Sequence, residues 1–238
     1  MKENALRWPN GKARALTFSW DDCVTQDRRL LELMRKYGIK GTFNLNSGEF
    51  GKSGSLVQAG VELDHSHVAA EEVRSLYAGQ EVAAHTVTHP HILQLDDEAY
   101  LKELTEDCAS LEALTGTPMR GMAYPYGEND DRIRKLTVSC GMHFARGIRE
   151  TGDFSLPVDP MDWACTCHCS DMDRYIDAFL SDEGIGGLFS VWGHSYELDL
   201  GDGWRKLEEG LARLSGHADV WYATNGEVFD YLESEHVL

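Results

Sequence analysis

Short apolar runs alternate with amphipathic stretches along almost the whole chain, and this alternation limits the possible folds more than any other feature. Alternation of this kind is typical of parallel strands covered by helices. The stretch 47–68, rich in Gly and Ser, interrupts it and is predicted to be a long loop. The predicted strands are residues 13–20, 41–46, 81–86, 120–124, 143–148, 163–167, 187–192 and 220–223. The predicted helices are residues 25–37, 69–78, 96–114, 130–140, 173–180 and 204–214.

Seven or eight strand–helix units can close into a barrel. We therefore expect an α/β fold, a distorted (β/α) barrel of about seven parallel strands. An open, doubly wound sheet is the alternative, but no Gly-rich phosphate loop follows the first strand to favour it. The sequence shows no low-complexity linker and no internal repeat, which predicts a single domain over residues 1–238.

The charge balance limits the possible partners. The chain has 40 acidic and 22 basic residues, a formal net charge of -18. Such a field repels phosphate groups, so we expect no nucleic-acid partner and no anionic membrane partner. The first residues form no apolar signal segment, which predicts a cytoplasmic protein with reduced cysteines, although a removed leader would leave the same pattern. The oligomeric state stays open.

Polar residues follow the predicted strands at the ends where a parallel barrel gathers its reactive groups. Asp21-Asp22 follows the first strand, and His85 and His89 follow the third. Two imidazoles and one carboxylate are a common ligand set for one divalent metal ion, zinc first, with cobalt, nickel or iron also possible. The second aspartate would then be free to act as a general base. Each pair alone is also common in ordinary surface turns. Both pairs lie at the same end of the predicted barrel, however, and this favours the metal site.

Five segments, in order between residues 17 and 194, resemble the motifs of the polysaccharide deacetylases, the family 4 carbohydrate esterases with a nodulation-protein homology domain. The second motif, H-[ST]-x-x-H, is complete at His85-Thr86-Val87-Thr88-His89. The other four segments are Thr17-Phe18-Ser19-Trp20-Asp21-Asp22, Pro125-Tyr126-Gly127, Asp159-Pro160-Met161-Asp162-Trp163 and the apolar strand ending in His194.

This resemblance implies roles for individual residues. Asp22, His85 and His89 would hold the metal, and Asp21 would be the base that activates the attacking water. The backbone N–H of Tyr126 would stabilise the oxyanion, and His194 would protonate the leaving amine. The third and fourth motifs would supply the substrate contacts, which are expected from Tyr124, Pro125, Asp162 and Trp163.

The third motif lacks its arginine, because Ala123 stands at that position. In the family, that arginine pairs with the catalytic aspartate and with an aspartate of the fourth motif. A buried carboxylate without a cation would have a raised pKa, so another cation is expected in its place. Arg146, near the end of the neighbouring strand, is the candidate, and a surface ion pair is the alternative for it. Arg120 lies at the wrong end of its strand.

Other polar residues receive a simpler interpretation. The segment Cys165-Thr166-Cys167-His168-Cys169 could bind zinc, but on a strand the three cysteines share one face and His168 points away, so small buried side chains are favoured. Glu197 is expected in a solvated loop. The remaining histidines, among them His65, His67 and His91, have no partner that the sequence identifies.

The resemblance implies an enzyme, a metal-dependent hydrolase that removes acetyl groups, with N-acetyl groups preferred, from a small or oligomeric carbohydrate. Two alternatives remain. One is a hydrolase of the same fold acting on an O-acetyl ester or on a non-sugar amide such as a ureide. The other is a catalytically inactive carbohydrate-binding protein, which the missing arginine would support.

Overall fold

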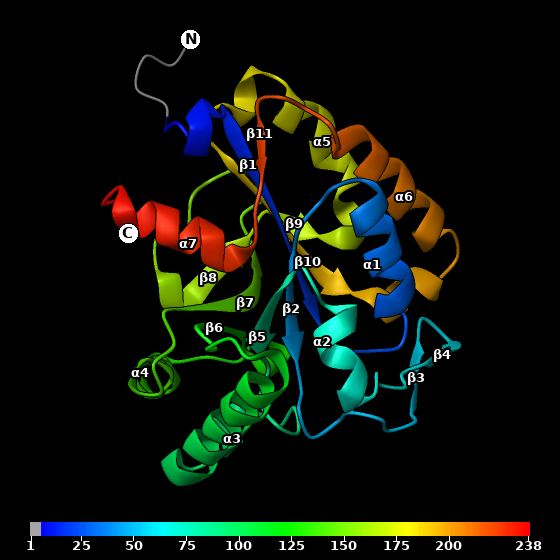
Figure 1. Ribbon diagram of the computed structural model, residues 1–238, viewed down its shortest axis with the longest axis vertical. Helices are drawn as coiled ribbons and strands as arrows, with labels where there is room; N and C mark the ends of the chain where they lie inside the picture. The colour runs from blue at the N-terminus through cyan, green and yellow to red at the C-terminus, as the bar shows by residue number, and fades with distance from the viewer. Residues whose placement is uncertain (1–5) are drawn as a thin grey trace.

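The computed structural model describes residues 6–238, and its parallel strands form a closed, irregular ring (Figure 1). The strand order is β8-β7-β6-β5-β2-β1-β10-β9, and β8 and β9 are consecutive parts of one segment interrupted at Thr166. That segment therefore joins β7 to β10 and closes the ring. The strands are β1 (Arg14–Asp21), β2 (Thr42–Leu45), β5 (Glu81–Ala84), β6 (Gly121–Ala123), β7 (Phe144–Glu150), β8 (Trp163–Cys165), β9 (Cys167–His168), β10 (Leu188–His194) and β11 (Val220–Tyr222).

Strand β1 explains why the barrel is distorted. One edge of β1 pairs with β10 over nearly its full length. On the other edge, the first half of β1 pairs with β11 and the second half pairs with β2. The expected barrel of about seven strands is therefore present, with β11 inserted between the lower parts of β1 and β2.

The sequence of β1 follows the two environments on its faces. Leu16, Phe18 and Trp20 belong to the main hydrophobic core, which the strands share with the helices. The alternate residues are small or polar, because they fill the narrow barrel interior. Thr17 donates a hydrogen bond to Asn225 there, and Ser19 accepts one from Arg146. The interior is therefore polar well before the strand reaches its carboxyl end.

Helices cover the outside of the ring, as Figure 1 shows for α5, α6 and α1. Helix α6 packs against both α1 and α5, and α3 packs against α2 and α4. Within residues 6–238, none of the helices is both long and apolar enough to cross a membrane. The helices are α1 (Asp27–Lys36), α2 (Val73–Leu76), α3 (Asp97–Thr115), α4 (Asp131–Ser139), α5 (Asp173–Leu180), α6 (Gly203–Leu214) and α7 (Asn225–Ser234).

Two elements differ from the sequence-based prediction. The predicted loop 47–68 contains an antiparallel hairpin of β3 (Ser55–Gln58) and β4 (Val61–Asp64). Ala59 and Gly60 both have positive φ values, 49° and 77°, as tight hairpin turns require. Helix α7 was not predicted; its first turn is capped by Thr224, which accepts a hydrogen bond from the Glu227 N–H. Helix α7 and Trp8 form a second core with the lower ends of the strands.

Candidate active site

A cavity of about 540 Å³ lies at the carboxyl ends of the strands. Its lining residues come from the ends of β1, β2, β5, β6, β7 and β10 and from the β3–β4 hairpin. Seven predicted site residues line this cavity: Asp21, Asp22, His85, His89, Tyr124, Tyr126 and His194.

Asp22, His85 and His89 offer ligand atoms that all lie within 4.8 Å of one another. Asp22 Oδ1 is 3.6 Å from Nε2 of His85 and 3.7 Å from Nε2 of His89. The Nδ1 of His85 lies 2.7 Å from the carbonyl oxygen of Ala123, to which it donates. That hydrogen bond leaves the Nε2 lone pair facing Asp22, the tautomer that a metal-binding imidazole needs. These three residues therefore fit one divalent metal ion.

The loops that carry the three ligands, and the loop that carries Tyr126, contain residues in an unusual backbone conformation. Asp22, Thr86, His89 and Tyr126 all have positive φ values, between 53° and 79°. Side chains other than Gly rarely adopt this conformation, and it is often found at functional sites. Asn46 helps to hold the loop after β5, because its side-chain amide donates to the carbonyl oxygen of Thr86 at 2.9 Å.

A buried carboxylate on α3 also holds this loop. Asp107 accepts hydrogen bonds from the backbone N–H of Ser47 at 2.8 Å and of His85 at 3.0 Å. Burial raises the pKa of Asp107 to about 6, although these hydrogen bonds act in the opposite direction. Asp107 therefore holds the start of the second motif from behind, a role that no sequence pattern indicated.

Asp21 forms a buried ion pair with Arg146, the residue that the sequence proposed in place of the missing arginine. Arg146 is 1% exposed, so the alternative of a surface ion pair for it was wrong. Asn44 also donates to Asp21, at 2.8 Å. Burial alone would raise the pKa of Asp21, but Arg146 and the facing His85 and His194 lower it, so the carboxylate stays ionised.

His194 faces both aspartates from β10. Its Nε2 lies 3.9 Å from Oδ2 of Asp21 and 3.9 Å from Oδ2 of Asp22. Burial lowers the pKa of His194, but the contact with Glu197 and the two aspartates outweigh this effect and raise it. The cavity therefore presents an ionised carboxylate and an imidazole on neighbouring walls.

Three of the four predicted substrate contacts do not line the cavity. Trp163 is 1% exposed and packs with Phe144 in the lower core. Pro125 is buried in the turn after β6, and Asp162 pairs with Arg149 at 2.8 Å. Only Tyr124 lines the cavity as expected, and its hydroxyl donates to the Met161 carbonyl. The side chains at these motif positions serve packing and a surface ion pair here.

Trp192, one of three tryptophans that could line a sugar groove by sequence, lines the cavity, whereas the favoured Trp163 does not. Three histidines in or beside the cavity were missed by the sequence interpretation. Nε2 of His65, on the segment after β4, lies 3.4 Å from Oδ2 of Asp22. The ring of His67 packs edge-on against that of His65. His91 stacks on the ring of Tyr126 with centroids 4.1 Å apart. No sequence signal placed the hairpin next to β1, so these contacts could not be foreseen.

Glu197 was expected in a solvated loop, but most of its side chain is buried. Its side chain is only 15% exposed and contacts both His168 and His194. The three cysteines of the 165–169 segment are buried, as predicted, and all six thiols of the chain are free.

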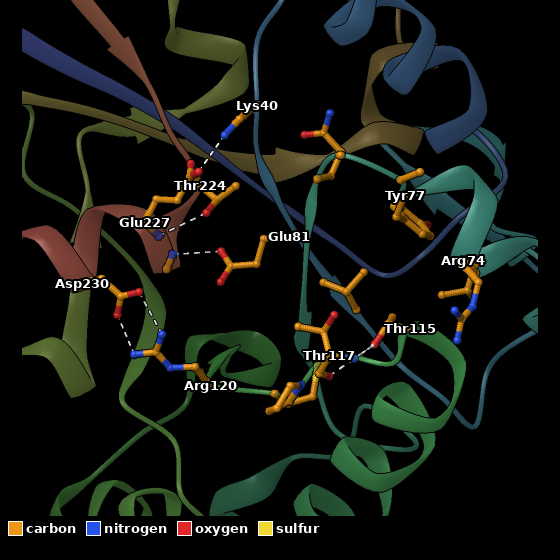
Figure 2. A pocket seen from close by; sticks show the side chains of 18 residues that line it. Lys40, Arg74, Tyr77, Glu81, Thr115, Thr117, Arg120, Thr224, Glu227 and Asp230 are labelled. Carbon is orange, nitrogen blue, oxygen red and sulfur yellow. Dashed lines mark hydrogen bonds and ion pairs between the residues drawn. The ribbon is translucent and has the colours of Figure 1, made fainter. Parts of the chain in front are cut away.

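A second cavity, of about 530 Å³, lies at the opposite end of the barrel (Figure 2). Two of its three cations are already paired, Lys40 with Glu227 and Arg120 with Asp230, and Arg74 donates to the Leu114 carbonyl at 3.0 Å. Glu81 points into it and accepts hydrogen bonds from Thr42 and from the Gly226 N–H. The residues around it include no set of metal ligands among those the structure describes. The chemistry is therefore assigned to the cavity at the carboxyl ends.

Comparison with solved structures gives the same fold. A polysaccharide deacetylase structure from Mycobacterium smegmatis has a TM-score of 0.73 at 17% identity, covering 99% of this chain and 96% of that one. The chitin deacetylase of Colletotrichum lindemuthianum has a TM-score of 0.63 at 15% identity, covering 91% and 87%. A family 4 carbohydrate esterase pseudoenzyme from Bacillus anthracis has a TM-score of 0.60 at 17% identity, covering 97% and 70%.

Sequence comparison gives the family. A curated chitin deacetylase from Amylomyces rouxii is 28% identical over 86 residues, which is 36% of this chain and 20% of that protein. The chain thus matches about a fifth of the length of that relative. The sequence profile of the family described as polysaccharide deacetylase matches residues 8–145, more than half of the chain. This chain belongs to the polysaccharide deacetylase family.

Proposed function

We propose that this protein is a divalent-metal-dependent hydrolase that removes the acetyl group of an N-acetylated carbohydrate. One observation carries the proposal. The candidate metal ligands Asp22, His85 and His89, the ionised Asp21 and the imidazole of His194 all line a single cavity. The curated chitin deacetylase that this chain resembles in sequence supports a carbohydrate substrate.

Each residue has a task that its surroundings suit. A bound divalent metal would polarise the acetyl carbonyl and lower the pKa of water to roughly 7. Asp21, kept ionised by Arg146, accepts a proton from the attacking water. The Tyr126 N–H donates to the oxyanion, which is worth on the order of 3 kcal/mol. His194 gives a proton to the amine nitrogen as the C–N bond breaks.

The inactive-binder alternative loses its main support. It rested on the missing arginine of the third motif, and Arg146 occupies that role in space by pairing with Asp21. A pseudoenzyme is present among the similar structures, but at 17% identity that likeness shows the fold alone.

The proposal is tested by acetate release from a panel of N-acetylated and O-acetylated saccharides. Protein stripped of metal and then reloaded with zinc or cobalt should release acetate only after reloading. Asp21→Asn should lower kcat by about 100-fold or more, whereas the exposed Glu209→Gln should match the wild type. Metal-loaded protein that releases acetate from none of the saccharides would contradict the proposal.

A further inference from the structure

Glu197 is a largely buried carboxylate that the proposed reaction does not use, and it lies directly behind His194. Its Oε2 is 3.2 Å from Nδ1 of His194. The same Oε2 accepts the backbone N–H of His194 at 3.3 Å. Among the described residues, that buried Nδ1 makes no hydrogen bond, and Oε2 of Glu197 is the carboxylate oxygen within ion-pair distance of it. The ring nitrogen turned away from the cavity therefore faces a carboxylate.

Two side chains from other elements hold Glu197 in this place. His168, on β9, donates from Nε2 to Oε2 at 2.8 Å, and Gln58, on β3, donates to Oε1 at 3.0 Å. Burial alone would raise the pKa of Glu197, but the contacts with His168 and His194 and their opposite charges lower it far below its ordinary value. Glu197 is thus an ionised carboxylate fixed from both sides.

The hydrogen bonds and the protonation of His168 favour a brace over a metal site for this cluster. His168, Cys169 and Glu197 lie close enough together to hold an ion. Burial lowers the pKa of His168, but Cys169 and Glu197 outweigh it and raise the pKa to about 10. In the neutral form, the Ser170 N–H donates to Nδ1 at 3.3 Å, which again puts the hydrogen on Nε2. Nε2 then carries a hydrogen in both forms, and a metal would have to displace it.

We propose that Glu197 is a positioning residue that holds His194 with a hydrogen on Nδ1, and that His168 and Gln58 keep Glu197 in place. The inference rests on the proposed function, because it assigns a task within that reaction. With Nδ1–H directed at Glu197, Nε2 faces the cavity and the two aspartates. When Nε2 gives its proton to the leaving amine, the ring returns to the neutral Nδ1–H form.

A purely structural role for Glu197 is the alternative. The turn Ser195–Asp199 starts at His194, and an acid three residues into a helical turn often caps its first N–H. Glutamine caps equally well, because its carbonyl oxygen also accepts that N–H. Glutamine has no charge, however, so its carbonyl oxygen attracts the Nδ1 hydrogen more weakly, whereas the two aspartates still attract a hydrogen on Nε2. Glu197→Gln therefore keeps the cap and removes the proposed function.

The test uses zinc-loaded Glu197→Gln, with the exposed Glu209→Gln as the matched control. We expect kcat to fall at least about 10-fold in Glu197→Gln while KM changes less than about twofold. Nitrogen-15 spectra of the histidine rings should show His194 with hydrogen on Nδ1 in the wild type and on Nε2 in the variant. The melting temperature should stay close to that of the control.

Three results would overturn the proposal: an unchanged kcat, a rise in KM alone, or an unchanged His194 tautomer. If Glu197→Gln does not fold, His168→Gln tests the brace instead, and an unchanged kcat there would also overturn it. A sulfur-to-cobalt charge-transfer band in cobalt-loaded protein would show Cys169 binding metal, and would overturn the brace. Because the ring spectra need no substrate, they decide the role of Glu197 even if the wild type deacetylates nothing.

Discussion

The pair of Arg146 and Asp21 is the residue-level feature on which the candidate site most depends. Both side chains are buried, at 1% and 4% exposure. The Nε of Arg146 also donates to Ser19, and its Nη1 donates to the Gly147 carbonyl, each at 3.0 Å. The guanidinium therefore joins the base to two strands, and its loss should affect stability as well as chemistry.

We expect Arg146→Ala to lower the free energy of unfolding by about 3–5 kcal/mol, because it leaves the Asp21 charge buried without a cation. In an Asp21→Asn background, the same substitution should cost less, since that charge is already gone. Urea unfolding of the two single variants and the double variant at pH 7 measures this difference. Strictly additive losses would show that the two side chains do not interact.

At the scale of elements, a buried carboxylate ties three segments together behind the site. Asp27, in the first turn of α1, accepts hydrogen bonds from Tyr77 at 2.7 Å and from Ser195 at 2.6 Å. Tyr77 follows α2, and Ser195 follows His194 directly. Burial raises the pKa of Asp27 to about 7, and these hydrogen bonds only partly oppose the rise.

This raised pKa predicts how stability depends on pH. Between about pH 4 and pH 7 the folded protein keeps the Asp27 proton and the unfolded chain loses it, so stability falls as pH rises. The total loss is roughly 4 kcal/mol and is complete above pH 7. Asp27→Asn should remove this part of the slope, whereas the exposed Asp182→Asn should not. Chemical unfolding across this pH range checks it, and parallel curves for wild type and Asp27→Asn would contradict it.

The order of the elements could be predicted because each one carries a local signal. Apolar runs marked the barrel strands, and helical periodicity marked α1 and α3–α6. The hairpin of β3 and β4 was missed, because its turn is Ala59-Gly60 in a polar, Gly-rich stretch. Helix α7 was missed because its apolar residues form a recognisable face only where they meet Trp8 and the lower strands.

At the scale of the whole molecule, residues at strand ends could be predicted, and contacts between distant loops could not. Asp21, Asp22, His85, His89 and His194 follow strands directly, so the closed ring brings them together. Arg146 was foreseeable because β7 ends at the same edge. Glu197 and His65 depend on how the hairpin and the turn after His194 fold over the cavity. Trp163 was misplaced because the strand containing it turns that side chain to the lower core.

The ring also determines what a metal would do to the stability of the molecule. Asp22 follows β1 and the two histidines follow β5, with β2 between these strands, so one ion would join non-adjacent parts of the ring. Because the ion binds the folded chain, zinc at 100 times its Kd should add about 2.7 kcal/mol. For a chain of this size, that corresponds to a rise of about 5–10 °C in Tm.

Scanning calorimetry of metal-free protein, with and without zinc, measures this rise. Asp22→Asn should lose most of it, because a neutral amide is a poor ligand in place of the carboxylate. Glu209→Gln should keep it in full. An equal rise in Asp22→Asn would mean that zinc binds elsewhere, and the assignment of Asp22, His85 and His89 as the metal site would then be wrong.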